Sequence, residues 1–263
     1  MRILLLGGTG NLGRRLIPAL LSHNHTLTLL LRNPSKLTSL ITPNLHALIS
    51  AIETGDATDA AAIKRTLVAH DIEAIINVAG DQVRSGEEWV LPKIAKAVTE
   101  AAIQVSEERG KGRELRVWIT CGLGIAAYPG TGRLIQDFLP KFATQQHNAT
   151  LEIVERIPVS SLRWSLLAIA MMYPLNADQG PYSPITEPKP HGLQVGAGSP
   201  PRWKDHWLGK LWWVGLYLNV WRAVLGDYCT HYENVADFLA EDVQRDGEEW
   251  VGKRVVLWED WGV

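Results

Sequence analysis

Short apolar runs recur along the first two thirds of the chain, and most of them stop close to a glycine. They occupy residues 2–6, 27–31, 46–52, 74–78, 117–120 and 162–170. Uninterrupted apolar runs of this length are typical of strands that a parallel sheet buries on both faces. The pattern therefore predicts six strands in this part of the chain.

Helical periodicity fills the intervals between these runs. Apolar residues recur at helical spacing over residues 14–22, 59–69, 88–108 and 149–156, and Asp59 is placed to cap the second of these segments. Strands and helices that alternate in this way call for a parallel sheet with right-handed crossovers and helices on both faces. We therefore predict an α/β fold, a Rossmann-type doubly wound parallel sheet.

The alternation stops in the last third of the chain. Residues 174–201 hold seven of the 14 prolines and predict an irregular loop, which the apolar segment 208–226 follows. A short helix at 234–243 and a closing strand at 251–257 complete the pattern. We expect residues 173–263 to form a small elaboration on the sheet of residues 1–172, within one globular unit.

This elaboration contains a Trp-rich helical insertion. Five of the 11 tryptophans fall within 19 residues: Trp203, Trp207, Trp212, Trp213 and Trp221. Residues 211–221 carry no charge, but a helix needs roughly 20 apolar residues to cross a bilayer, so no transmembrane segment is predicted. Three interpretations stay open: a lid over a large apolar ligand, an interfacial helix or one that forms a homodimer, and ordinary core beneath a long loop.

Composition and charge exclude several classes of partner. The 263 residues are 46% hydrophobic and carry 26 basic against 28 acidic side chains, with no run of five like charges. This distribution gives no electrostatic footprint for nucleic acid. Cys121 and Cys229 lack the spacing of a zinc site or disulfide framework, and the N-terminus lacks the features of a signal peptide. We expect a cytoplasmic protein without a metal.

A glycine-rich turn follows the first predicted strand directly. Gly7-Gly8-Thr9-Gly10-Asn11-Leu12-Gly13 stands between that strand and the first predicted helix. Glycine lets the backbone approach a pyrophosphate closely, and the helix N-terminus offers unpaired N–H groups and the positive end of its dipole. In the context of strand, turn and helix, the motif predicts a dinucleotide site in residues 1–172.

Arg32 ends the second predicted strand, where proteins that bind NAD carry an acidic residue. A guanidinium at this position favours the 2′-phosphate of NADP, and Arg14 and Arg15 could assist it. Asp56, after the third strand, is a candidate acceptor for the adenine amine. We therefore predict NADP, in its reduced form NADPH, as the cofactor.

Several segments in this order resemble the atypical short-chain dehydrogenase/reductase superfamily, in its NmrA-like, NAD(P)-binding branch. They are GGTGNLGRRL, LLLRNPSKL, GDATD, INVAG and VWITCG, with SSLRWSLL, ENVADFLAEDV and VGKRVVL downstream. The resemblance implies pyrophosphate contacts at Gly7, Thr9, Gly10, Asn11, Leu12 and Gly13, a 2′-phosphate contact at Arg32, an adenine contact at Asp56, and ribose contacts at Asn77, Ala79 and Gly80. It also places Thr120 and Cys121 beside the nicotinamide.

The Tyr-x-x-x-Lys pair of typical members is absent. None of the six tyrosines has a lysine four residues on, and Tyr128, seven residues past Cys121, is followed at that distance by Gly132. Tyr128 and His147 nevertheless remain candidates for a catalytic role together with Thr120 and Cys121, because an imidazole can relay protons near neutral pH. Tyr173, Trp207 and Trp212 are the candidates for contact with the substrate.

The leading hypothesis is an NADP-dependent oxidoreductase that transfers hydride to or from an apolar, aromatic or conjugated small molecule. Two alternatives stay open. The same fold could serve a non-redox isomerisation, cyclisation or elimination, or it could act as an NmrA-like dinucleotide sensor that regulates a protein partner.

Overall fold

The computed structural model describes the chain except residues 81–87, 177–179, 206, 208–211, 245–247 and 262–263. One eight-stranded sheet, in the order β3-β2-β1-β4-β5-β6-β10-β8, forms its centre. These strands are β1 (Arg2–Leu6), β2 (Thr26–Leu31), β3 (Ala51–Thr54), β4 (Ala74–Asn77), β5 (Arg116–Gly122), β6 (Arg163–Ile169), β8 (Gln194–Ala197) and β10 (Lys253–Trp258). All neighbours are parallel except β8, which runs antiparallel to β10.

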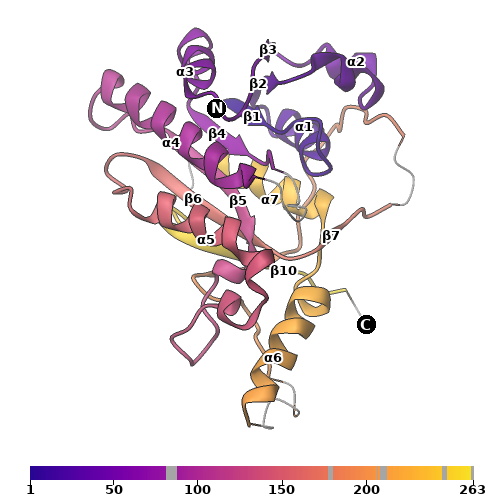
Figure 1. Ribbon diagram of the computed structural model, residues 1–263. Helices are drawn as coiled ribbons and strands as arrows, with labels where there is room; N and C mark the ends of the chain where they lie inside the picture. Colours follow the sequence, from indigo (N-terminus) through magenta and orange to yellow (C-terminus); the bar gives the residue numbers. More distant parts are fainter. Residues whose placement is uncertain (81–87, 177–179, 206, 208–211, 245–247, 262–263) are drawn as a thin grey trace.

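Helices cover both faces of this sheet (Figure 1). One face carries α1 (Gly13–Ser22) and α7 (Tyr232–Gln244), and the other carries α3 (Ala60–Ala69), α4 (Val90–Arg109) and α5 (Lys141–Glu155). The first four residues of the hydrophobic run in β1 are split between two cores, because successive strand side chains point to opposite faces. The predicted Rossmann-type fold is confirmed.

The third strand starts later than predicted. Residues 46–52 were expected to form it, but β3 covers Ala51–Thr54, and Pro43–His46 form the short helix α2 instead. Thr42 caps this helix through its side chain, which accepts a hydrogen bond from the Leu45 N–H, and Pro43 occupies its first turn. Both features favour a helix start over an extended strand.

The Pro-rich loop contains a strand that the sequence pattern did not predict. β8 lies inside residues 174–201 and pairs with β10 at the edge of the sheet. A second small sheet joins β7 (Met172–Tyr173) to β9 (Thr230–His231) in parallel. Because β7 follows β6 closely, this pairing brings the chain back to the end of β6 after the Trp-rich insertion.

That insertion forms helix α6 (Trp212–Arg222), which continues in a π-helical turn over Ala223–Asp227. In Figure 1, α6 extends away from the sheet. Val220 and Ala223 are buried, whereas the side chains of Val214, Tyr217, Leu218, Trp221 and Leu225 are 43–58% exposed. The interpretation as ordinary core is therefore wrong for this side of the helix.

Candidate functional site

The glycine turn packs backbone against backbone at the carboxyl ends of β1 and β4. Gly7 has a φ of 86°, and a Cβ on it would lie 2.5 Å from the Ala79 nitrogen. A Cβ on Gly13 would lie 2.0 Å from the Gly7 carbonyl oxygen. That oxygen also accepts a 2.9 Å hydrogen bond from the Gly10 N–H. Glycine is therefore required at both ends of the turn, where α1 begins against the end of β1.

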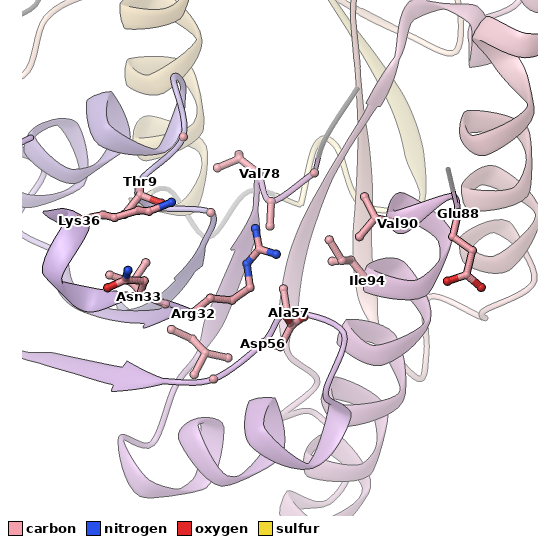
Figure 2. A pocket seen from close by; sticks show the side chains of 17 residues that line it. Thr9, Arg32, Asn33, Lys36, Asp56, Ala57, Val78, Glu88, Val90 and Ile94 are labelled. Atoms are coloured by element: carbon pink, nitrogen blue, oxygen red, sulfur yellow. The ribbon is translucent and has the colours of Figure 1, made fainter. Parts of the chain in front are cut away.

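A cavity of about 630 Å³ opens beside this turn (Figure 2). Its walls come from the carboxyl ends of β1 to β4 and the start of α4, namely Gly7, Thr9, Gly10, Leu30, Leu31, Arg32, Asn33, Lys36, Gly55, Asp56, Ala57, Val78, Ala79, Gly80, Glu88, Val90 and Ile94. The volume falls within the range of small-molecule sites, about 300–1,000 Å³. The carboxyl end of an open parallel sheet, where the strand order reverses, is the expected place for a ligand.

The cavity carries two basic side chains on the segment that follows β2. Arg32 comes directly after the strand, and Lys36 stands four residues on in the 3₁₀ helix η1 (Pro34–Ser39). Figure 2 shows the Arg32 guanidinium inside the cavity, between Val78 and Ala57. Both side chains are exposed, so an anion could reach them without displacing protein groups.

Asp56 lines the cavity after β3, in a turn that fixes its carboxylate. The Thr58 N–H donates to Asp56 Oδ1 over 2.8 Å, and the Thr58 hydroxyl donates to the same oxygen over 2.7 Å. The backbone hydrogen bond is the main reason that the pKa of Asp56 is lowered, with the positive charge of Arg32 a smaller cause. The carboxylate therefore stays ionised at the mouth of the cavity.

Seven of the predicted cofactor residues line the cavity, and four do not. Asn11, Leu12, Gly13 and Asn77 are the exceptions. Leu12 is buried in the core, and Gly13 lies against Gly7. The Asn77 side chain accepts a 3.1 Å hydrogen bond from the Ala79 N–H, so it supports the end of β4.

Asn11 lies just before α1 and accepts hydrogen bonds from two arginines of that helix. Its side-chain oxygen accepts from Arg14 Nη2 over 2.8 Å, and its carbonyl accepts from Arg15 Nη1 over 2.7 Å. Arg15 is buried and pairs with Glu233 of α7 at 2.6 Å. The assisting role in phosphate binding is therefore wrong for Arg15, whose guanidinium points to α7.

The end of β5 lies one strand beyond this cavity. Cys121 is buried, and burial raises the pKa of its thiol to about 12. His147 Nδ1 accepts a 3.0 Å hydrogen bond from the Gly122 N–H and lies 3.6 Å from the Cys121 sulfur. Burial lowers the pKa of His147, so the ring is neutral and carries its hydrogen on Nε2. The structure thus brings Cys121 and His147 together and disfavours a thiolate nucleophile. Thr120 does not join them, because its side chain points to the opposite face of the sheet from Cys121.

Tyr128 lies elsewhere, in a polar cluster beneath the Trp-rich segment. Its hydroxyl donates to Asp205 Oδ1 over 2.8 Å and accepts from Asn219 Nδ2 over 3.1 Å. Trp203 also donates to Asp205, over 3.0 Å. Burial raises the pKa of Tyr128. This tyrosine therefore ties α6 to the body of the protein, a role that its sequence position does not reveal.

The three predicted substrate residues do not converge in the described part of the chain. Tyr173 is half-exposed on β7 and meets the Trp261 ring at 6.1 Å. Trp207 is 69% exposed. Trp212 begins α6, and its side chain lies outside the described part of the chain.

Sequence reasoning missed Lys36, Val90 and Ile94 among the residues that line the cavity. Lys36 carried a signal, because it stands four residues after Arg32 in a segment that begins with proline. Val90 and Ile94 have helical i, i+4 spacing, but that spacing alone equally fits a core face. Among the described residues, no group of three histidine, cysteine or acidic side chains could hold a metal ion, and no helix is long and apolar enough to span a membrane.

A family model described as NAD(P)H-binding matches residues 7–197, which include the glycine turn and the strands β2, β3 and β4 that border the cavity. The chain belongs to this NAD(P)H-binding family. The resemblance to atypical short-chain dehydrogenases is thereby confirmed, and the family match supports a nicotinamide dinucleotide as the cofactor.

Two curated relatives of the NAD(P)H-binding chain are UDP-glucose 4-epimerases. The enzyme of Neisseria meningitidis serogroup B (strain ATCC BAA-335 / MC58) is 24% identical over 218 residues, and that of serogroup C is 23% identical over the same length. The alignment covers 76% of this chain and 63% of the epimerase. The chain thus spans less than two thirds of the length of these relatives.

Solved structures share the fold of this family member over nearly its whole length. The anaerobillin reductase ChuY of Escherichia coli O157:H7 superposes with a TM-score of 0.61 at 14% identity, covering 99% of this chain and 98% of that one. The oxidoreductase ylbE of Lactococcus lactis gives a TM-score of 0.57 at 15% identity, covering 99% and 91%. At such identities the likeness shows the fold.

Proposed function

We propose that this chain is an NADP-dependent oxidoreductase that reduces an apolar, conjugated carbonyl compound. The observation that carries the proposal is the pair of basic side chains after β2, Arg32 and Lys36, which face a cavity in a family that binds nicotinamide dinucleotides. An acidic residue at the end of β2 would bind the ribose hydroxyls of NAD and repel a 2′-phosphate. Two cations in its place favour the phosphate.

The donor set of the cavity fits the adenine, 2′-phosphate and pyrophosphate parts of this cofactor. The glycine turn and the start of α1 would hold the pyrophosphate, because Gly7, Thr9 and Gly10 line the cavity and a helix N-terminus attracts anions. Asp56 would accept from the adenine amine, and Val90 and Ile94 of α4 would cover the apolar face of the ring. When bound, the reduced cofactor supplies a hydride to an electrophilic carbon.

The end of β5 would position the substrate in this proposal. His147 fixes the Gly122 backbone through its Nδ1, whereas Thr120, also near the end of β5, offers its hydroxyl on the opposite face of the sheet. Cys121 fills space beside His147. His147 acts as a positioning residue, and the hydrogen-bonded Tyr128 takes no part in the reaction.

The apolar surface near the end of β6 supports a conjugated substrate. Met171, Tyr173 and Trp261 are each 42–43% exposed there, and exposed aromatic side chains commonly mark ligand surfaces. The fold is also shared with a protein named as an anaerobillin reductase and with one named as an oxidoreductase, which is in keeping with a reductase.

The experiment is a turnover screen with NADPH and NADH against aromatic ketones, 9,10-phenanthrenequinone and linear tetrapyrroles, followed at 340 nm. We expect NADPH to support turnover of at least one compound at a kcat/KM at least tenfold above NADH. Arg32→Ala should reduce this preference, whereas Arg156→Ala, at a remote and highly exposed position, should preserve it. Tight NADPH binding without turnover of any compound would contradict the reductase and favour the dinucleotide sensor.

A further inference from the structure

A buried carboxylate lies just beyond the end of β10, and three donors hold it. Glu259 accepts hydrogen bonds from the His231 backbone N–H over 2.7 Å, from His231 Nδ1 over 2.6 Å and from Asn234 Nδ2 over 2.6 Å. Its residue is only 9% exposed. None of these residues lines the cavity beside the glycine turn, so they form a polar cluster separate from it.

The cluster fixes the orientation of the His231 ring. A carboxylate can only accept, so Nδ1 must donate, and Nε2 is left as the atom that exchanges a proton. The ring also stacks on the Trp261 indole at 4.2 Å with an interplanar angle of 27°, and the indole N–H donates to the Cys229 carbonyl over 2.9 Å. The His231 side chain keeps 16% exposure, and the described residues provide no hydrogen-bond partner for Nε2.

Strand register places the cluster at the same edge of the sheet as the cofactor turn. Val256 of β10 is level with Ala168 of β6, which is level with Cys121 of β5, and all three strands are parallel. Glu259 therefore lies three residues past that level, beyond the carboxyl edge. Two strand spacings separate it laterally from β5, or about 10 Å.

A second set of contacts agrees with this position. His231 directly precedes α7, whose first turn contains Glu233. Glu233 binds Arg15 at 2.6 Å, and Arg15 in turn donates to the Asn11 carbonyl of the glycine turn. The start of α7 is therefore linked to the cofactor turn on one side and to the end of β6 on the other, because β9 pairs with β7.

We propose that His231, oriented by Glu259, donates and accepts the proton of the reaction in this chain, which lacks a Tyr-x-x-x-Lys pair. This inference rests on the proposed reductase function. Reduction of a carbonyl adds a hydride to carbon from the reduced cofactor and a proton to oxygen, so that C=O becomes CH–OH. His231 Nε2 gives that proton and regains one from water. Glu259 is a positioning residue, because it holds the ring through Nδ1 and stabilises its positive charge.

A second histidine–glutamate pair in the chain shows what a structural pair looks like. His70 Nε2 lies 2.8 Å from Glu53, but both side chains are more exposed, at 25% and 45%, and neither lines the cavity. No aromatic stacking is found for the His70 ring in the described part of the chain. This pair supplies a matched control.

The test combines a spectroscopic readout with turnover on the full chain. Long-range ¹H–¹⁵N spectra of the apo protein, with the His231 signals assigned from His231→Gln, report which ring nitrogen carries hydrogen. We expect Nδ1–H in the neutral ring, and a shift of the Nε2 signal when 9,10-phenanthrenequinone is added to the NADP⁺-loaded protein. With NADPH, His231→Gln should lower kcat at least tenfold with the Kd for NADPH within twofold of wild type, and Glu259→Gln should change the tautomer and lower kcat several-fold. His70→Gln should leave all readouts unchanged.

Each contrary outcome is distinct. Hydrogen on Nε2 with a bare Nδ1, or an unchanged kcat in His231→Gln, overturns the assignment of His231. A shifted Nε2 signal without turnover by the wild type overturns proton transfer and leaves a ligand contact. Failure of the wild type to bind NADPH overturns the proposed function itself. The spectra of the apo protein still show whether Nδ1 of His231 carries hydrogen, and so test its orientation by Glu259 separately.

Discussion

The cofactor end and the Trp-rich, C-terminal end of the molecule are held together by contacts of very different range along the chain. At the cofactor end, Gly10 bonds back to Gly7, Thr58 bonds to Asp56, and the Ala79 N–H bonds to Asn77. Each of these bonds joins residues two or three positions apart. The turns that border the cavity are thus closed by hydrogen bonds between residues that are close in the sequence.

The other end depends on partners that are distant in the sequence. Tyr128 and Asp205 are 77 residues apart, and His231 and Glu259 are 28 apart. Such contacts form only after the sheet and both layers of helices are in place. The family's local motifs therefore form the walls of the cavity in which we propose the dinucleotide, whereas long-range packing positions the polar groups of the C-terminal end.

Gly13→Ala is the substitution expected to break the cofactor end most severely. The new Cβ would fall 2.0 Å from the Gly7 carbonyl oxygen, so the start of α1 must move away from β1. We expect the free energy of unfolding to fall by about 3 kcal/mol and the Kd for NADPH to rise more than tenfold. Chemical denaturation and calorimetric titration measure the two effects.

Gly226→Ala is the control, because a Cβ at this glycine of the C-terminal region meets nothing within 4 Å. It should leave the Kd for NADPH unchanged. A Gly13→Ala protein that binds NADPH as tightly as the wild type would contradict the close-packed turn.

Asp237→Asn tests the C-terminal region through pH. Burial raises the pKa of Asp237 from 3.8 to about 6, so the folded state binds more protons than the unfolded state between these pH values. The contribution of Asp237 to stability is therefore present at low pH and is lost as the pH rises through about 6. We expect Asp237→Asn to increase the free energy of unfolding by about 2 kcal/mol at pH 7.5 and by little at pH 4.

Urea denaturation of wild type and variant between pH 4 and 8 measures this difference. Glu100→Gln removes the same charge from an exposed position on α4 and should give no such pH dependence. A constant difference between wild type and Asp237→Asn across the whole range would show that burial does not perturb this carboxyl.

Tyr128→Phe has the smallest expected effect on stability, and it tests whether the C-terminal end can be changed without changing cofactor binding. The substitution removes the hydrogen bond that the hydroxyl donates to Asp205 and the one that it accepts from Asn219. Asp205 keeps its donors Asn219 and Trp203. We expect stability to fall by about 1 kcal/mol, with the Kd for NADPH within twofold of wild type. A Kd that rises tenfold in this variant would mean that the polar cluster controls the cofactor cavity and would remove the distinction between the two ends.

The fold could be predicted from the sequence because its main signals are local. Apolar runs gave the strands β1, β2, β4, β5 and β6, and Asp59 does cap α3 through bonds to the Ala61 and Ala62 N–H groups. The edge strand β8 was not predicted, because Gln194–Ala197 is short and has no apolar pattern that indicates its pairing with β10.

The site was predictable only in part, for the same reason. The glycine turn and Arg32 stand next to strands that the sequence reveals, and both line the cavity. Tyr128 was chosen for its distance from Cys121, yet its hydroxyl faces a carboxylate that only the fold brings near. His231 and Glu259 carried no motif, because neither residue has a neighbour in sequence that marks its chemistry.

We propose that the cavity at the ends of β1 to β4 binds NADPH through Arg32 and Lys36. The most direct measurement is calorimetric titration of NADPH and NADH into the wild type, Arg32→Ala, Lys36→Ala and the remote control Arg156→Ala. The account predicts a Kd for NADPH at least tenfold below that for NADH, a preference that Arg32→Ala abolishes, Lys36→Ala weakens and Arg156→Ala keeps. Equal affinities for the two cofactors in the wild type, or a preference that survives in Arg32→Ala, would contradict it.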